Sequence, residues 1–242
     1  MSTPETLEGK EIVLAGGSGG IGSAAAEQLL AERARLVISY HANRDRAPRW
    51  EPVATVLQAD LTIAADRQRL LDAAPNLYAL VVFAGDPARF ADPAQAEAAM
   101  RRSHDVNYLG PILLAREAAQ RMREASIPGA IILISTMQAN ALFAGSTVYA
   151  SQKAALQHAA LILAKECRGP ANIRVNVVSP GITAAGMAEA SIASGKYDRY
   201  VQDGTIPRFG RAIDVARAIR FFLQPDNYVT GQVLCVDGGI TL

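Results

Sequence analysis

The sequence is poor in cysteine, and its two cysteines lie far apart. Cys167 and Cys235 form no Cys-x-x-Cys pair, and two thiols in 242 residues cannot build a disulfide framework. We therefore expect both to be reduced thiols in the core. The three histidines, His41, His104 and His158, are scattered along the chain, so the sequence predicts no metal site.

The sequence also lacks an excess of charge and any long apolar run. Its 24 Lys and Arg against 23 Asp and Glu leave a formal net charge of +1, which suits neither a nucleic acid nor an anionic membrane. No apolar run reaches the length of a membrane span, and residues 1–5 show neither the basic nor the apolar region of a signal peptide. We expect a cytoplasmic protein with no nucleic-acid partner and no membrane partner.

Apolar runs of strand length alternate with helical patterns throughout the chain, and half of its residues are hydrophobic. The strands are expected at Ile12–Leu14, Leu36–Ser39, Val53–Leu57, Tyr78–Phe83, Ala130–Ile134, Ile173–Val178 and Gln232–Val236. The helices are expected at 23–34, about 64–74, about 93–125, 149–168 and 214–223. Continuous apolar runs are typical of strands buried on both faces of a parallel sheet. The alternation predicts one α/β domain over residues 1–242, with a doubly wound, seven-stranded parallel sheet.

A glycine-rich turn separates the first expected strand from the first expected helix. Two spacings fit it, Gly17-x-Gly19-x-x-Gly22 and Gly16-x-x-x-Gly20-x-Gly22. Glycine allows a tight turn and a close approach of phosphate, and the following helix offers free N–H groups. The motif therefore favours a dinucleotide site, although a tight turn without a ligand would need the same glycines.

The connection between residues 40 and 53 is unusual for such a fold. Pro48 and Pro52 leave room for no more than one or two helical turns. Its arginine-rich composition fits a solvated loop or part of a cofactor rim.

Tyr149 and Lys153 are four residues apart at the start of an expected helix, so they share one helix face. A phenol is a poor proton donor at neutral pH. A nearby ammonium group favours the phenolate and lowers the pKa of the phenol. A partly buried tyrosine beside a surface lysine would show the same spacing.

Several motifs in fixed order nevertheless point to one family. They are Gly16-x-x-x-Gly20-Ile21-Gly22, Asp60-Leu61, Ala84-Gly85, Asn107, Ser135-Thr136, Tyr149-x-x-x-Lys153, Ser179-Pro180-Gly181, Val229-Thr-Gly-Gln232 and Val236-Asp-Gly-Gly239. Over nearly its full length the chain resembles the classical short-chain dehydrogenase/reductase family, most of all the branch with 3-oxoacyl-carrier-protein reductases. The resemblance implies a single-domain Rossmann fold and a dimer or tetramer, and we expect a homotetramer. The expected helices at 93–125 and 149–168 have long Ala, Leu and Ile faces that suit an interface.

The resemblance also implies the catalytic residues. Tyr149 would donate a proton to a carbonyl or accept one from an alcohol, and Lys153 would lower the phenol pKa and hold the nicotinamide ribose. Asn107 would belong to the proton relay. Because Pro111 has no N–H, the carbonyl of Asn107 loses its helical partner and could hold a water leading to Lys153. A helix that simply ends near Gly110 is the alternative.

The substrate hydroxyl departs from the family pattern. The serine usually found thirteen residues before the tyrosine is Thr136 here. Thr136 keeps a hydroxyl that can polarise a substrate oxygen, and its methyl narrows the pocket. Ser135 is the alternative, but neighbouring strand residues point to opposite faces. We expect Thr136 to face the cleft.

Three further departures concern the cofactor side. The Asn-Asn-Ala-Gly of the family is Val82-Phe83-Ala84-Gly85, and the usual Thr before the first glycine is Ala15. The Thr that usually meets the carboxamide is Ala185, with Thr183 as a displaced candidate. These departures motivate an alternative to an enzyme, namely a nucleotide-binding sensor or scaffold with little turnover.

The cofactor preference depends on the end of the second strand. Ser39, Tyr40, Asn43 and Arg44 precede the first carboxylate there, Asp45. Hydroxyl, amide and guanidinium groups suit the 2′-phosphate of NADP(H), so we expect NADP(H) to be favoured over NAD(H). The cofactor-binding residues are expected to be Gly16, Ser18, Gly20, Ile21, Ser39, Tyr40, Asn43, Arg44, Asp60, Leu61, Ala84, Gly85, Tyr149, Lys153, Pro180, Gly181, Ile182 and Thr183. Among them, Asp60 and Leu61 should flank the adenine.

The resemblance places a mobile substrate lid at about 184–206, a stretch rich in Ala, Gly and Ser. Further pocket walls are expected from Gln138, Asn140, Phe143, Met187 and Tyr197. The predicted activity is NADP(H)-dependent interconversion of a ketone and a secondary alcohol. A 3-oxoacyl or polyketide-like substrate is expected by likeness alone.

Overall fold

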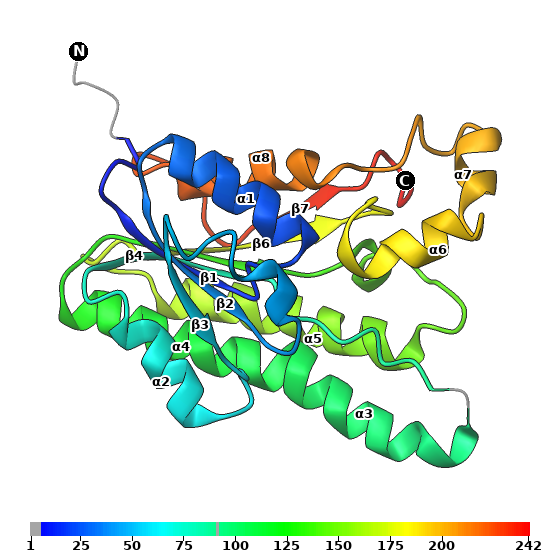
Figure 1. Cartoon of the computed structure of the whole chain (residues 1–242), viewed down its shortest axis with the longest axis horizontal. Coiled ribbons are helices and arrows are strands. Elements are labelled where there is room, and N and C mark those ends of the chain that lie inside the picture. The colour runs from blue at the N-terminus through cyan, green and yellow to red at the C-terminus, as the bar shows by residue number, and fades with distance from the viewer. Residues whose placement is uncertain (1–5, 91) are drawn as a thin grey trace.

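The computed structural model describes residues 6–90 and 92–242, which form a seven-stranded parallel sheet between two helical layers (Figure 1). Residues 1–5, where we predicted no signal peptide, lie outside the described residues. The strands are β1 Glu11–Ala15, β2 Arg35–Tyr40, β3 Thr55–Gln58, β4 Leu77–Val82, β5 Ala130–Ile134, β6 Arg174–Pro180 and β7 Val233–Val236. Their order is β3-β2-β1-β4-β5-β6-β7. The predicted doubly wound sheet is confirmed. The strand order reverses between β1 and β4, which is where ligands bind in such folds.

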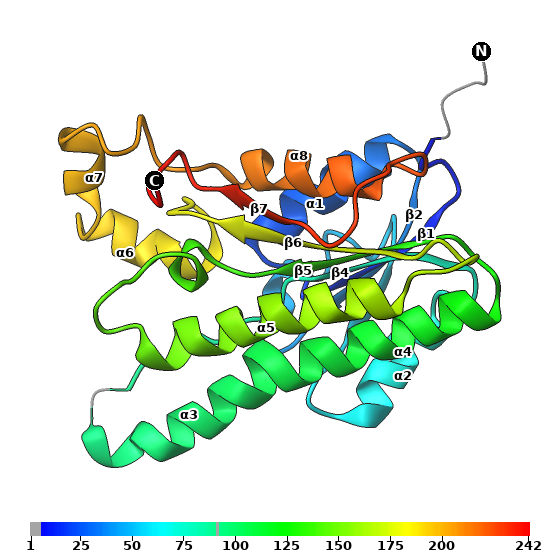
Figure 2. The ribbon, with the colours of Figure 1, turned by 180° about the vertical axis from the view of Figure 1, so that it is seen from behind.

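Helices cover both faces of the sheet (Figures 1 and 2). One face is covered by α1 Gly20–Ala31 and α8 Ala212–Leu223, and the other by α2 Ala64–Asp72, α4 Gly110–Glu124 and α5 Thr147–Glu166. The carboxyl ends of the strands all point to one end of the molecule. Two shorter helices, α6 Glu189–Ala193 and α7 Asp198–Gln202, lie at that end.

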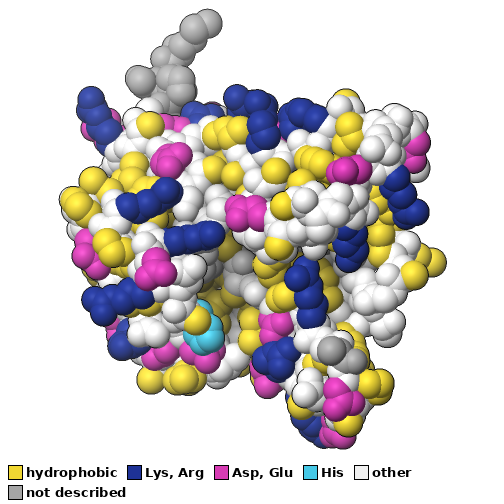
Figure 3. All heavy atoms as spheres, turned by 45° about the vertical axis from the view of Figure 1, so that its right-hand side comes forward, with side chains coloured by type: hydrophobic (Ala, Val, Ile, Leu, Met, Phe, Trp, Pro, Cys, Tyr) yellow, Lys and Arg dark blue, Asp and Glu magenta, His cyan; other side chains and the backbone are white. Residues whose placement is uncertain are grey.

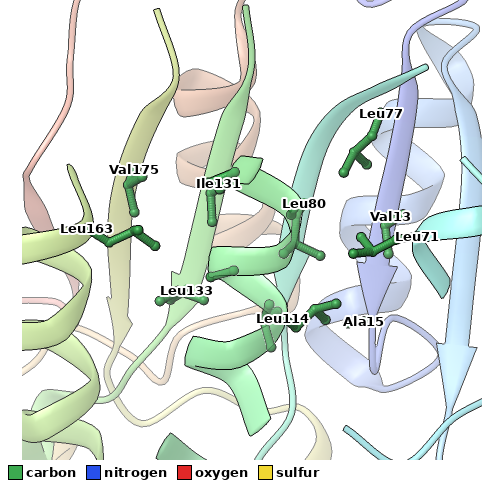
Figure 4. Close-up of a cluster of buried hydrophobic side chains, with 14 of the residues drawn as sticks. Val13, Ala15, Leu71, Leu77, Leu80, Leu114, Ile131, Leu133, Leu163 and Val175 are labelled. Carbon is green, nitrogen blue, oxygen red and sulfur yellow. The ribbon is translucent and has the colours of Figure 1, made fainter. Parts of the chain in front are cut away.

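Two apolar clusters hold these layers together, one on each side of the sheet. Figure 4 shows the cluster under α2, α4 and α5, where Leu80 and Ile131 from the central strands meet Leu114 and Leu163 from the helices. The central strands β4, β5 and β6 are buried at every position, as expected.

The edge strands do not follow that expectation. β3 and β7 are only partly buried, because each has a neighbour on one side alone. Cys167 lies in the core, but Cys235 on β7 is exposed, so the prediction that both thiols lie in the core was wrong for Cys235. β3 also begins two residues later than expected, since residues 47–54 form turns after a short 3-10 helix at Arg44–Arg46.

The helix predicted over 93–125 is not one continuous α-helix. A 3-10 turn at Pro93–Gln95 leads into α3 Ala96–His104, a π-helical segment Asp105–Leu109 and then α4. The N–H of Gly110 donates to the carbonyl of Asp105, a π-type bond. Pro111 explains the interruption, since it has no N–H to donate. The alternative that the helix ends near Gly110 was also wrong, because α4 continues directly.

The described residues also limit the sites that this fold can hold. None of the helices in the described part is long and apolar enough to cross a membrane. Within residues 6–90 and 92–242, no three His, Cys, Asp or Glu side chains gather as a metal site would require.

Candidate active site

A cavity of about 910 Å³ opens at the carboxyl ends of the strands. Figure 3 views the molecule from this side, where the surface is hollowed and dark-blue side chains border the hollow. The cavity walls come from the glycine turn, the segments after β4, β5 and β6, the start of α5 and the α6–α7 region. Residues far apart in the sequence therefore meet at the switch point of the sheet.

Helix α5 places Tyr149 and Lys153 in this cavity. The helix begins at Thr147, so both side chains lie in its first two turns and on one face. Lys153 is 2% exposed, and its Nζ donates to the carbonyl oxygens of Ala84 at 3.1 Å and Ile134 at 2.9 Å. These carbonyls follow β4 and end β5, so the ammonium group is fixed to two neighbouring strands.

Burial shifts the pKa of both groups. It lowers the pKa of Lys153 to about 7, while the two carbonyl oxygens favour the protonated form. It raises the pKa of Tyr149 to about 12, although a side-chain hydrogen bond with Thr136 lowers it. The expected fall in the phenol pKa is therefore not found in this structure, where burial outweighs the hydrogen bond with Thr136.

Thr136 and Ser135 follow β5 and point in different directions. Thr136 hydrogen-bonds the Tyr149 side chain and lines the cavity. The Oγ of Ser135 donates to the carbonyl of Lys153 at 3.2 Å and accepts from Gln157 at 3.0 Å. Both residues line the cavity, but the Ser135 hydroxyl is bonded within the protein, whereas the Thr136 hydroxyl lies beside the phenol.

Asn107 is fully buried in the π-helical segment and does not line the cavity. Its amide donates to the carbonyl of Asp86 at 2.8 Å, and its Oδ1 accepts from the N–H of Asp86 at 3.0 Å. The side chain therefore fixes the segment after β4, next to Gly85. Its place in a proton relay stays a prediction.

The glycine turn has the shape of a phosphate site. Gly16 has φ +76°, which favours glycine, and a Cβ at Gly22 would lie 2.6 Å from the Cα of Gly17. No side chain caps the N-terminus of α1 at Gly19, so its first-turn N–H groups stay available to an anion. Gly16, Gly20 and Ile21 line the cavity, whereas Ser18 does not. These features fit the diphosphate of a dinucleotide.

The predicted adenosine residues lie outside this cavity. Ser39 is 1% exposed, and its hydroxyl accepts from the N–H of Gly16 at 2.9 Å. Ser39 thus supports the glycine turn from below, and the prediction that its hydroxyl faces a 2′-phosphate does not fit this contact. Asn43 caps the turn at Arg44–Arg46, and the Arg44 guanidinium is exposed without a hydrogen-bond or ion-pair partner among the described residues. Tyr40 is partly buried.

Asp60 and Leu61 differ in how far their side chains are exposed. Asp60 lies on the surface, with its carboxylate 3.5 Å from His41 and bound to Thr62. Leu61 is buried, and its carbonyl accepts from Arg67 at 2.8 Å. The Leu61 side chain therefore packs in the core, so only its backbone or Asp60 can face an adenine.

The other predicted cofactor residues line the cavity in the described structure. They are Ala84, Gly85, Pro180, Gly181, Ile182 and Thr183, together with Tyr149 and Lys153. The hydroxyl of Thr183 donates to the carbonyl of Gly181 at 3.2 Å.

The residues that depart from the family pattern are apolar and pack within the protein. Ala15 is buried at the end of β1. Phe83 packs against the cluster under α1 and α8 and also lines the cavity. Ala185 lies against the glycine turn, because a Cβ at Gly20 would lie 3.0 Å from its own.

The region 184–206 contains a 3-10 turn at Gly186–Ala188 and helices α6 and α7. Gln138, Phe143, Met187 and Tyr197 line the cavity, as expected. Asn140 does not, since its amide donates to Ser179 at 2.8 Å and to Cys235. Sequence reasoning missed other lining side chains, for which no motif gives a signal: Arg89, Phe90, Leu142, Lys196, Arg199 and Tyr200.

Comparisons with known proteins agree with this geometry. Residues 15–241 match the family model described as enoyl-(acyl carrier protein) reductase. An oxidoreductase of Methylorubrum extorquens is 33% identical over 97% of this chain and 98% of its own. An Arabidopsis thaliana chloroplastic protein named NADPH-dependent aldehyde reductase 2 is 29% identical, over 100% of this chain and 97% of its own.

A solved short-chain dehydrogenase/reductase from Mycobacterium ulcerans superposes with a TM-score of 0.90 at 27% identity, covering 98% of this chain and 91% of the other. The family model spans nearly the whole chain, and the residues that line the cavity come from that span. The chain belongs to the short-chain dehydrogenase/reductase family and is an oxidoreductase that acts on CH–OH or C=O groups with a nicotinamide cofactor.

Proposed function

We propose that this protein reduces a ketone to a secondary alcohol with NADPH, or runs the reverse reaction, in the cavity that holds Tyr149. The observation that supports this most is the convergence of Tyr149, Thr136 and Lys153 on one cavity that also contains the glycine turn. The bound cofactor would supply the hydride, and the protein would supply orientation and the proton.

The protein's part begins with the carbonyl oxygen of the substrate. The Thr136 hydroxyl and the Tyr149 phenol lie together, so one oxygen can accept from both. As negative charge develops on that oxygen, the phenol proton moves to it. Lys153, held by two carbonyls, stabilises the phenolate left behind. In the alcohol direction the same groups take the proton back.

The preference for NADPH is proposed from the surface near β2. Arg44 presents a guanidinium without a partner among the described residues, and His41 lies nearby against Asp60. A guanidinium can grip a phosphate with two hydrogen bonds. The Arabidopsis relative is named as NADPH-dependent, which supports the proposal.

The experiment that tests the function is a screen of NADPH oxidation by the whole chain against carbonyl compounds. The panel contains simple ketones, 3-oxoacyl thioesters, polyketide-like diketones and 2-enoyl thioesters, because a 3-oxoacyl or polyketide-like substrate is part of the proposal. We expect turnover with a ketone. Tight NADPH binding without turnover on any member would favour the alternative, a nucleotide-binding sensor or scaffold.

We further propose a homotetramer in the cytoplasm. Figure 2 shows α3, α4 and α5 along one face. Met100 on α3, Leu109 in the π-helical segment before α4 and Ile162 on α5 are 47%, 40% and 47% exposed. Light scattering at micromolar concentration should give an oligomer that Ile162→Glu dissociates. Val53→Glu, at a residue 55% exposed in the loop before β3, is the matched control. A wild-type monomer at that concentration would contradict the proposal.

A further inference from the structure

The charges that face the cavity are all of one sign. Among the described residues, Lys153 and three further cations line it: Arg89 after β4, Lys196 before α7 and Arg199 on α7. No described Asp or Glu lines it. This is unusual in a chain whose formal net charge is only +1.

None of the three outer cations forms an ion pair with a described carboxylate. Arg89 makes only a long contact with Ser191 at 3.5 Å, and Lys196 lies 5.4 Å from the centre of the Tyr197 ring. Arg199 donates to the Tyr200 hydroxyl at 3.0 Å. Elsewhere on the surface, arginines such as Arg33, Arg49 and Arg116 each pair with a glutamate.

Two carboxylates in the same region are engaged by backbone groups. Glu189 accepts from the N–H of Gly186 at 2.9 Å, and Asp203 accepts from the N–H of Thr205 at 3.0 Å. The Tyr200 hydroxyl and, to a smaller extent, Asp203 raise the pKa of Arg199, so this arginine stays charged. Because no described carboxylate lines the cavity beside Lys196 and Arg199, the cavity side of α6 and α7 is positive.

Apolar side chains line the same cavity. Phe90, Leu142 and Met187 are 39%, 104% and 47% exposed, and Phe143 lies beside them in the wall. A ligand that suits this surface has an apolar body and an anionic end.

We propose that the natural substrate is an apolar ketone or alcohol with an anionic group remote from the reacting carbon, held by Arg89, Lys196 and Arg199. This rests on the proposed function, because it concerns the substrate of the same site. The anion can be a carboxylate or a phosphate ester, since both accept charge-assisted hydrogen bonds from these groups. The competing role for the cations is attraction of the cofactor, which is itself an anion.

The test uses three methyl ketones of equal chain length: 9-oxodecanoate, its methyl ester and 9-oxodecyl phosphate. We expect kcat/KM to be about tenfold or more higher for an anion than for the ester, because charge-assisted hydrogen bonds add affinity. The advantage should shrink at 0.5 M salt, which screens exposed charges. The anion with the larger gain in kcat/KM over the ester shows whether the natural substrate has a carboxylate or a phosphate ester.

The variants are Arg89→Gln, Lys196→Gln and Arg199→Gln, alone and combined. We expect the ratio of kcat/KM between anion and ester to fall toward one in the triple variant. Arg217→Gln, an exposed arginine on α8 outside the cavity, is the matched control with an unchanged ratio. A triple variant that keeps the ratio but binds NADPH more weakly would assign the cations to the cofactor and overturn the proposal.

Calorimetry separates this proposal from the proposed function, since it needs no turnover. The whole chain is titrated with 9-oxodecanoate and with its ester, with and without NADP⁺. Tighter binding of the anion, lost in the triple variant, would support the substrate class even if no ketone is reduced. Turnover with equal affinity for the anion and the ester would overturn the substrate class and leave the proposed function standing.

Discussion

The reaction centre and the region 184–206 face the same cavity but are built in opposite ways. In the centre, Lys153 is 2% exposed and bonded to carbonyls that follow β4 and end β5, and Asn107 grips the backbone of Asp86. In the region 184–206, Lys196 and Arg199 are exposed and form no ion pair among the described residues. The comparison teaches that backbone bonds fix the side chains that we propose to react, while the side chains that we propose to select the substrate are exposed.

The largest effect is expected from the phenol at the centre. Tyr149→Phe removes the proton donor and keeps the ring, so turnover should fall by about 10²–10⁴. Steady-state kinetics with the ketone found in the screen measures this. Tyr197→Phe, in the cavity wall near α7, is the matched control and should change turnover far less. Equal losses of turnover in both variants would contradict the different roles proposed for the reaction centre and the region 184–206.

Burial of the Lys153 ammonium group should also make the free energy of unfolding depend on pH. Its pKa is about 7 in the fold against 10.5 for an ordinary lysine, so the unfolded chain binds more protons between these values. Raising the pH from 7 to 9 should therefore increase the free energy of unfolding, by up to about 1.4 kcal/mol per pH unit. Below pH 7 this contribution stays constant.

Chemical denaturation at several pH values measures that slope, and Lys153→Met should remove it. The same variant should lose turnover and cofactor affinity. Tyr149 adds the opposite slope only above about pH 10, since its pKa rises from 10.0 to about 12. A wild-type slope that Lys153→Met leaves unchanged would show that another group is responsible.

A smaller effect is expected at the adenosine end. Arg44→Gln should weaken NADPH binding about tenfold and leave NADH binding nearly unchanged, because one charge-assisted contact to the 2′-phosphate is lost. Fluorescence titration with both cofactors measures this. Arg46→Gln, on the same 3-10 turn, is the control. If both variants lose NADPH affinity equally, the preference for NADPH comes from the general charge of the loop and not from a contact of Arg44.

The sequence predicted the sheet well because buried parallel strands are continuous apolar runs. It failed where one residue decides the local geometry. Pro111 breaks the ladder of a helix whose apolar pattern is uninterrupted, and Cys235 looks apolar although its strand lies at the edge. The exposure of Cys235 depends on the order of the strands, which periodicity does not encode.

The site was predicted in a similarly uneven way. Helical spacing suffices to bring Tyr149 and Lys153 together. Thr136 and Ser135 both line the cavity, and their different hydrogen-bond partners could not be predicted from the sequence. The contact of Ser39 with the glycine turn is tertiary, so a hydroxyl at the end of β2 was taken for a ligand group. The three outer cations come from the segment after β4 and from the α6–α7 region, which share no motif.

The most direct test compares two neighbouring hydroxyls. Thr136→Val keeps the shape and removes the group beside the phenol, so turnover should fall by about 10²–10³ while cofactor affinity stays the same. Thr136→Ser should retain activity. Ser135→Ala removes a hydroxyl that is bonded within the protein and should cost far less turnover. Normal turnover in Thr136→Val together with a dead Ser135→Ala would contradict this account of the reaction centre.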